Sequence, residues 1–241
     1  MDDRRFARVR RRLEGYLSLS GERNPEQHLD SIAGDPEARR ALRGFATTGA
    51  SEFFRDPGQF QTLAAEILPA LTEATGRFEA WSAGCSCGAE PYSLAMALED
   101  LRSRPDYRVL GTDIDEASVA RARAGGPYAP HELTNVDQER LLRYFLEEKG
   151  AYRVRPELRR RIALRVHDLL RDEFEIGFDL ILCRNVAVYL SSTAKNGLIE
   201  RLAAALRPGG VLFLGASETV PFPAEKGLEH IHGPFYRRPA G

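Results

Sequence analysis

The chain has few cysteines and lacks any long apolar run, and these two absences narrow the classes of protein to which it can belong. Three cysteines are too few, and odd in number, for a disulfide framework, so we expect a cytoplasmic protein. No run reaches the roughly 18 apolar residues of a transmembrane helix, and no apolar segment of a signal peptide follows the first arginines. The formal net charge of -1 gives no global field that would recruit nucleic acid. We therefore expect neither nucleic-acid binding nor membrane insertion.

Two hydrophobic patterns divide the 241 residues into a helical part and an α/β part. Up to residue 76, apolar residues recur at helical spacing, and an Asp-Pro pair at 56–57 is a helix start. From Phe78 onward, short apolar runs alternate with helical patterns, which predicts a parallel sheet covered by helices. The predicted strands are 78–83, 108–111, 162–166, 178–183 and 211–215, with an edge strand at 235–237.

The domain organisation follows from the change of pattern at Phe78. We expect a helical domain with its linker over 1–76 and an α/β domain over 77–241. Alternating apolar and polar residues after Gly150 predict a small antiparallel insert at about 147–166.

A turn of small residues follows the first predicted strand, within residues 81–93 (WSAGCSCGAEPYS). Gly84 and Gly88 remove side chains where the backbone must turn sharply and meet a ligand closely. Ser86 and Ala89 break the dinucleotide fingerprint G-x-G-x-x-G, and no Gly-Lys-Ser/Thr of a phosphate loop follows. The pattern suits a cofactor with a ribose and no phosphates, although a plain strand–helix turn would look the same.

Carboxylates follow the next two predicted strands. Asp113 could accept hydrogen bonds from two ribose hydroxyls, whereas Asp115 suits the N-cap of the following helix. Asp168 could accept a hydrogen bond from an adenine amine, with Leu169 against the base. The last pair alone is a weak signal, because a polar residue after a strand is commonplace.

Other polar side chains are expected near the same edge of the sheet. The strand 178–183 delivers Arg184 and Asn185 there, and Tyr189 could return to the same place on a turn of helix. A half-buried core tyrosine is the simpler alternative for Tyr189. Arg55, after two anchoring phenylalanines, could hold a carboxylate as a bidentate fork, or be an ordinary surface arginine. The cysteines lack the ligand number and spacing of a zinc site, so no metal is expected.

Together these residues resemble the CheR-type chemotaxis receptor methyltransferases, which are S-adenosylmethionine-dependent protein-glutamate O-methyltransferases. The matching blocks, in chain order, are Phe53 to Asp56, Trp81 to Ser93, Thr112 to Asp115, Asp168 to Leu170, Phe178 to Tyr189, and Pro208 to Glu218. The resemblance implies a Rossmann-like class I methyltransferase domain, an N-terminal all-helical domain and a small inserted antiparallel β-subdomain. It implies methyl transfer from S-adenosylmethionine to receptor glutamates, with S-adenosylhomocysteine as the product.

The resemblance also implies roles for individual residues. Arg55 and Tyr189 would lie by the sulfonium and the incoming glutamate as the catalytic pair. The cofactor would be bound by Ser51, Arg55, Ala83, Gly84, Cys85, Glu90, Asp113, Asp168, Leu169, Asn185 and Val186. Glu90 would hold its amino-acid end, Asp113 its ribose, and Asp168 with Leu169 its adenine.

The expected partners are the cytoplasmic helices of chemoreceptors. Six arginines between Arg4 and Arg12 could dock on an acidic partner, or form a solvated face. The short insert suggests that no C-terminal receptor pentapeptide docks.

The chain departs from the family pattern at two places. Gly49-Ala50-Ser51 replaces the usual Asn-x-Thr, and Cys87 and Ala89 stand where Thr and Glu are common. These departures leave open a diverged cofactor-binding regulator without transfer activity. A methyltransferase of the same fold with a non-receptor substrate is the other alternative.

Overall fold

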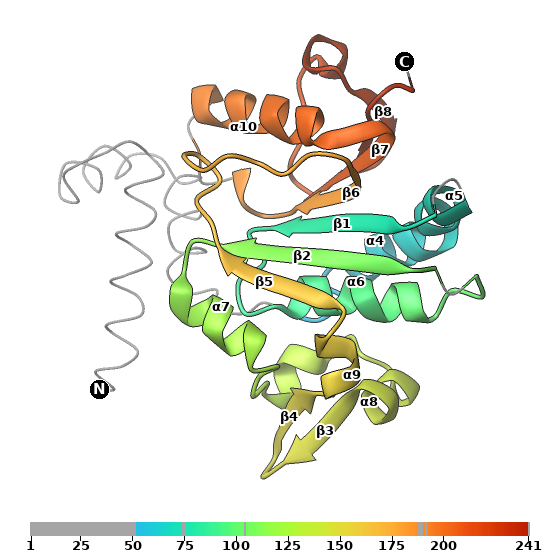
Figure 1. Ribbon diagram of the computed structural model, residues 1–241, viewed down its shortest axis with the longest axis vertical. Coiled ribbons are helices and arrows are strands. Elements are labelled where there is room, and N and C mark those ends of the chain that lie inside the picture. Colours follow the sequence, from blue (N-terminus) through green and yellow to red (C-terminus); the bar gives the residue numbers. More distant parts are fainter. Residues whose placement is uncertain (1–51, 74–75, 104, 188–189, 191, 241) are drawn as a thin grey trace, which may run out of the picture.

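The structure is a computed structural model that describes residues 52–240, except 74–75, 104, 188–189 and 191 (Figure 1). The expected helices before residue 51, with their arginines, lie outside the described residues. Ser51 and Tyr189 lie outside them as well, so their predicted roles stay predictions.

A seven-stranded sheet organises the described part of the chain, in the order β5-β2-β1-β6-β7-β9-β8. Its strands are β1 (Phe78–Ala83), β2 (Tyr107–Asp113), β5 (Ile162–Val166), β6 (Phe178–Cys183), β7 (Leu206–Leu214), β8 (Glu229–His232) and β9 (Phe235–Arg237). The strands from β5 to β7 pair in parallel, whereas β9 pairs antiparallel with both β7 and β8. The expected Rossmann-like α/β fold is confirmed.

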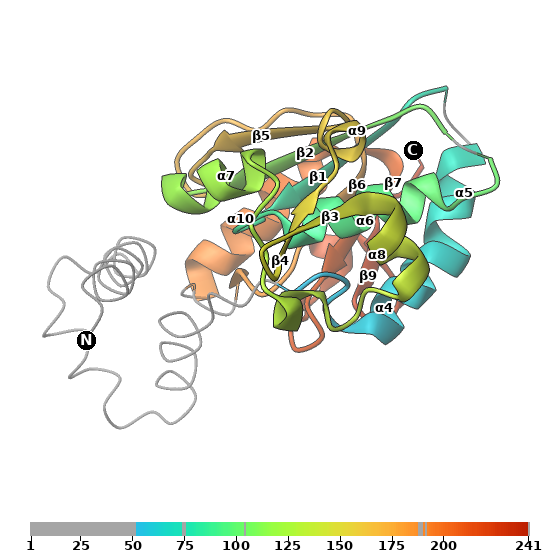
Figure 2. The ribbon, with the colours of Figure 1, turned by 90° about the horizontal axis from the view of Figure 1, so that it is seen from below.

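Helices pack on both faces of this sheet because the central strands are apolar on both sides. On one face, α6 (Ala89–Glu99) shares a core with α4 (Pro57–Thr62), the π-helical turn η1 (Leu63–Ile67) and α5 (Leu68–Glu73) (Figure 2). On the other face, α10 (Ser192–Ala205) packs through a second core around Trp81. The segment 57–73, expected within the helical domain of 1–76, packs against this sheet, with Phe60 6.1 Å from Phe213 of β7, ring centroid to ring centroid. The division into two domains stays a prediction.

The small antiparallel element is a hairpin of β3 (Phe145–Glu148) and β4 (Ala151–Val154). Lys149 and Gly150 form its turn with φ of 52° and 77°, the left-handed values of a tight hairpin. It lies with α8 (Gln138–Tyr144) and α9 (Pro156–Arg159) at the lower end of the molecule in Figure 1. The expected insert of about 147–166 is too long, since β5 pairs in parallel with β2 in the main sheet.

Two connections complete the described chain. α7 (Glu116–Arg123) follows β2 and contacts β2 and β5. The 3-10 turns η2 (Pro130–Leu133) and η4 (Pro223–Lys226) precede α8 and β8. Within the described residues, no helix is long and apolar enough to span a bilayer.

Candidate cofactor and methyl-transfer site

The glycine turn after β1 has the sharp geometry that its sequence predicts. Gly84 and Gly88 have φ of 86° and 91°, values at which a side chain is strained. The amides of Gly84 and Cys85 both donate to the carbonyl of Thr112 at 2.8 Å, which fixes the turn to the end of β2. A Cβ added at Gly84 would lie 2.4 Å from Cγ2 of Val186. Glycine is therefore needed here because Val186, in the loop after β6, packs directly against the backbone of the turn.

Asp113, at the end of β2, is held against this turn. Its Oδ2 accepts a hydrogen bond from the amide of Ser86 at 2.7 Å, and its Oδ1 accepts one from the amide of Asp115 at 2.9 Å. These two hydrogen bonds hold the carboxylate at the end of β2, beside the glycine turn. Asp115 caps α7 as predicted, accepting from the amide of Ala117 at 3.2 Å.

Glu90 lies in the first turn of α6, largely withdrawn from solvent. Ser82 donates to its Oε1 at 2.8 Å, and the Nη1 of Arg184 lies 3.3 Å from its Oε2. Burial raises the pKa of Glu90, although Arg184, Ser82 and Arg55 act to lower it. The carboxylate is thus a buried negative charge beside the glycine turn, suited to a positively charged ligand group such as an ammonium.

Arg184 is the buried centre of the polar network, with its side chain only 1% exposed. Its Nη2 donates to Asp56 Oδ2 at 2.6 Å and to the carbonyl of Arg55 at 2.9 Å. Its guanidinium carbon lies 4.6 Å from the ring centroid of Phe213, a cation–π distance. Arg184 therefore ties Glu90 on α6 to the turn that carries Arg55.

The turn around Arg55 is held in an uncommon backbone conformation. The residues on either side of it, Phe54 and Asp56, have φ of 52° and 58°. The amide of Phe54 donates to the Oγ of Ser93 at 2.8 Å, and the amide of Phe53 donates to the carbonyl of Glu132 at 2.9 Å. Non-glycine residues at positive φ persist only where their surroundings hold them, and they cluster at functional sites.

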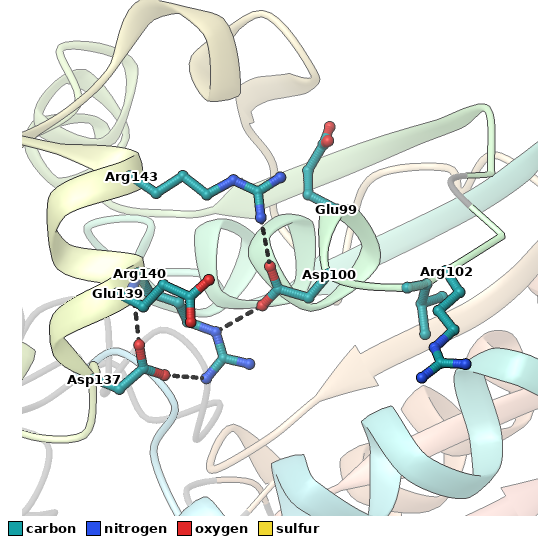
Figure 3. A pocket seen from close by; sticks show the side chains of 8 residues that line it. Glu99, Asp100, Arg102, Asp137, Glu139, Arg140 and Arg143 are labelled. Carbon is teal, nitrogen blue, oxygen red and sulfur yellow. Dashed lines mark hydrogen bonds and ion pairs between the residues drawn. The ribbon is translucent and has the colours of Figure 1, made fainter.

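An ion-paired pocket lies on the outer side of the same turn, between α6 and α8 (Figure 3). Arg140 Nε is 2.8 Å from Asp100 Oδ2 and Nη1 is 2.8 Å from Asp137 Oδ2. The guanidinium carbon of Arg140 lies 4.7 Å from the ring centroid of Phe54. Since Arg140 and Arg143 pair with Asp100 and Asp137, and Arg140 also contacts Phe54, we interpret this pocket as support for the Arg55 turn.

The loop after β6 carries Asn185 and Val186, next to the glycine turn. Asn185 has φ of 60°, and its amide donates to Glu218 Oε2 at 2.7 Å. Val186 lies against Gly84, and its predicted role in cofactor binding stays a prediction.

The residues after β5 are less directly connected to the turn. Asp168 Oδ1 accepts from the amide of Leu170 at 2.8 Å, and Leu169 is buried. The amide of His167 donates to the carbonyl of Asp113 at 3.0 Å, which brings this loop to the end of β2. Burial lowers the pKa of His167, so the buried ring is neutral near neutral pH.

The three cysteines are buried, and burial raises the pKa values of Cys85 and Cys183. Within the described part of the chain, no group of three or more His, Cys, Asp or Glu side chains is placed to hold a metal ion. Cys87 lies in the core beneath Tyr128, whose hydroxyl donates to the Cys87 carbonyl at 2.7 Å.

Three residues of this network carry no role in the sequence-based prediction: Arg184 as a bridge, Ser93 and Glu218. Each stands in one of the sequence blocks on which the family resemblance rests, so the sequence indicated that these positions matter. Their functions were not, because their partners lie far away in the sequence: Phe54 is 39 residues from Ser93, and Glu90 is 94 residues from Arg184.

The fold and the polar turn at the carboxyl ends of β1, β2 and β6 define a Rossmann-like α/β protein with a nucleoside-cofactor site at that edge. Comparison with known families gives a match over residues 49–236 to the model described as CheR methyltransferase, SAM binding domain. The chain therefore belongs to the CheR methyltransferase family, and it is an S-adenosylmethionine-dependent methyltransferase.

Curated relatives agree with this assignment. The chain is 39% identical over 191 residues to a chemotaxis protein methyltransferase of Listeria monocytogenes, covering 79% of this chain and 72% of the relative. It is 36% identical over 184 residues to chemotaxis protein methyltransferase 1 of Pseudomonas aeruginosa, covering 72% and 67%. It is also 36% identical over 180 residues to the chemotaxis protein methyltransferase of Escherichia coli, covering 71% and 61%.

Proposed function

We propose that this protein methylates glutamate side chains of chemoreceptors in the cytoplasm. The observation that carries the proposal is the family membership, joined to one feature of the structure: the Arg55 turn is tied through Arg184 to the helix that bears Glu90. This link supports a site in which Glu90 binds the cofactor and Arg55 binds the acceptor carboxylate at one edge of the sheet.

The residues present fit S-adenosylmethionine. Asp113 supplies a carboxylate at the end of β2 for the ribose hydroxyls, Glu90 supplies a negative charge for the amino group, and Val186 lies against the glycine turn. Asp168 and Leu169 would hold the adenine, and Ala83, Gly84 and Cys85 would pass beneath the nucleoside. Ser51 would add a hydroxyl beside Arg55. When bound, the cofactor supplies a methyl group activated by a positively charged sulfur.

The protein's contribution to the reaction is to position the acceptor. A glutamate carboxylate, with an unperturbed pKa of about 4.3, is already ionised near neutral pH, so no general base is needed. One of its oxygens forms the new bond to the methyl carbon as the carbon–sulfur bond breaks, which gives a glutamyl methyl ester. Arg55 orients the carboxylate and the Tyr189 hydroxyl helps to align the reacting groups. Alignment of this kind can supply about 7–11 kcal/mol of the barrier.

The receptor contact would be made by the arginine-rich segment between Arg4 and Arg12, docked on an acidic partner helix. The β3–β4 hairpin has four residues in each strand, which supports the expectation that no receptor C-terminal pentapeptide docks there.

The test is incorporation of labelled methyl groups from S-adenosylmethionine into receptor fragments, checked for release by mild base. We expect base-labile label in the wild-type reaction and almost none with Arg55→Ala. An exposed arginine of α7, changed in Arg123→Ala, is the matched control and should leave the rate unchanged. An Arg55→Ala rate equal to that of wild type would overturn the role of Arg55. Wild-type binding of S-adenosylhomocysteine without transfer to any receptor would favour the diverged regulator.

A further inference from the structure

Glu218 is a buried carboxylate that the methyl-transfer chemistry does not use. The residue is 2% exposed, and it lies in the loop that follows β7. Its Oε2 accepts hydrogen bonds from two backbone amides, those of Asn185 and Gly215, both at 2.7 Å. Its Oε1 is buried with no hydrogen-bond partner in the described chain. No cation is paired with Glu218 among the described residues, so the carboxylate is committed to these two amides.

The two amides lie just beyond the ends of β6 and β7, where the two segments separate. β6 and β7 pair in parallel as far as Cys183 and Leu214. Beyond these residues, the segment after β6 runs to Asn185 and Val186, and the segment after β7 runs toward η4. Amides beyond the last ladder pair have no strand partner, and a buried amide without one is costly. One carboxylate oxygen of Glu218 accepts from both segments. The amide of Glu218 itself donates to the carbonyl of Gly215 at 2.9 Å.

The contact with Asn185 fixes a backbone conformation that would otherwise be unfavourable. Asn185 has φ of 60°, in the left-handed region. That conformation turns the chain so that Val186 lies against Gly84 of the glycine turn. A change in the direction of the Asn185 amide would therefore move Val186 relative to the cofactor turn.

Gly215 leaves the space that this carboxylate occupies. A Cβ at Gly215 would lie 2.6 Å from Glu218 Oε2 and 3.0 Å from Asn185 Nδ2. The 2.6 Å contact requires the Glu218 carboxylate to move, because real Cβ atoms essentially never come within 3.0 Å, and the added Cβ would also lie 3.1 Å from the backbone nitrogen of Asn185. The glycine, the carboxylate and the left-handed asparagine thus form one unit.

From these contacts we infer that Glu218 is a positioning residue for the cofactor: it holds the Asn185–Val186 loop in its binding geometry by accepting from the amides at the ends of β6 and β7. The inference rests on the proposed cofactor role of Asn185 and Val186. It assigns Glu218 no contact with the cofactor.

Two substitutions test the inference independently. Glu218→Ala removes the acceptor, and Gly215→Ala keeps the carboxylate but displaces it. Both should weaken S-adenosylhomocysteine binding, measured by calorimetry, by about tenfold, which is the effect of losing one well-placed contact. Glu218→Gln retains an oxygen that can accept from both amides, so it should restore most of the affinity lost in Glu218→Ala.

Controls separate positioning from general loss of stability. Leu202→Ala empties part of the α10 core, and Ser217→Ala changes an exposed neighbour of Glu218. Measured at a temperature at which circular dichroism shows every variant folded, both should bind S-adenosylhomocysteine as wild type does. In the kinetic assay, the loss in Glu218→Ala and Gly215→Ala should appear mainly in the KM for S-adenosylmethionine, because the Arg55 turn is held separately by Ser93 and Arg184.

Either of two results overturns the inference. One is wild-type affinity in a folded Glu218→Ala or Gly215→Ala protein. The other is a loss in Leu202→Ala as large as in those variants, which would make the effect one of stability. Failure of the wild-type protein itself to bind S-adenosylhomocysteine would instead contradict the proposed function.

Discussion

Replacing Arg184 by methionine should strongly destabilise the protein without ligand. The side chain of Arg184 is 1% exposed and that of its partner Glu90 is 16% exposed, so the substitution leaves a carboxylate buried without its cation. Breaking a buried ion pair in this way typically costs about 3–5 kcal/mol. Asp56, whose side chain is 39% exposed, can be solvated and adds little. For a chain of this size the expected fall in Tm is about 6–20 °C.

The cost should depend on pH. Burial raises the pKa of Glu90, and Arg184 is the strongest influence that lowers it, so Arg184→Met raises this pKa further. A carboxyl group with a raised pKa in the folded state favours folding at low pH, and this contribution is lost as the pH rises through the folded pKa. The stability deficit of Arg184→Met relative to wild type should therefore be smallest near pH 4 and grow toward neutral pH.

Thermal and urea unfolding of the ligand-free proteins, followed by circular dichroism, provide the assay. The double variant Arg184→Met/Glu90→Gln is the key control, because an uncharged amide no longer needs a cation. It should recover a large part of the stability lost in Arg184→Met. A deficit below about 1 kcal/mol at neutral pH would refute the reasoning, since that is the size expected of an exposed pair. A deficit independent of pH, or no recovery in the double variant, would refute it too.

Two further changes test single contacts of the site. Asp113→Asn replaces one of the carboxylate oxygens, which accept from the amides of Ser86 and Asp115, by an amide donor. The affinity for S-adenosylhomocysteine, measured by calorimetry, should therefore fall by about tenfold or more. An unchanged affinity would remove Asp113 from the ribose site. Ser93→Ala leaves the buried amide of Phe54 without its acceptor, at a cost of about 1–3 kcal/mol that relaxation of the Arg55 turn can relieve. Methyl transfer should therefore slow in Ser93→Ala and recover in Ser93→Thr, which keeps the hydroxyl. If Ser93→Ala transferred methyl groups as fast as Ser93→Thr does, the hydroxyl would not position the turn.

The parts of the fold that the sequence predicted well are those set by local patterns. The apolar runs of β1 and β6 match the predicted strands residue for residue, and the Asp115 cap begins α7 as expected. β8 was not predicted, because Glu229–His232 is a short, mostly polar strand whose existence depends on pairing with β9.

The candidate site was predictable in its composition but less so in its connections. A motif places Glu90 on the first turn of a helix, but not the cation that compensates its burial. That cation comes from Arg184, which also holds Asp56, 128 residues away. Asp56 illustrates the difference: the sequence suggests a helix cap before Pro57, whereas its carboxylate binds Arg184 and makes no cap hydrogen bond. Such roles depend on tertiary contacts that no local spacing reveals.

The central claim is that the glycine turn, Asp113 and the Asn185–Val186 loop enclose one nucleoside cofactor. A crystal structure with S-adenosylhomocysteine tests it most directly. We expect the ribose hydroxyls within hydrogen-bond distance of the Asp113 carboxylate, and the sulfur on the side of Arg55. A nucleoside bound elsewhere, with no ribose hydroxyl within hydrogen-bond distance of Asp113, would contradict the account.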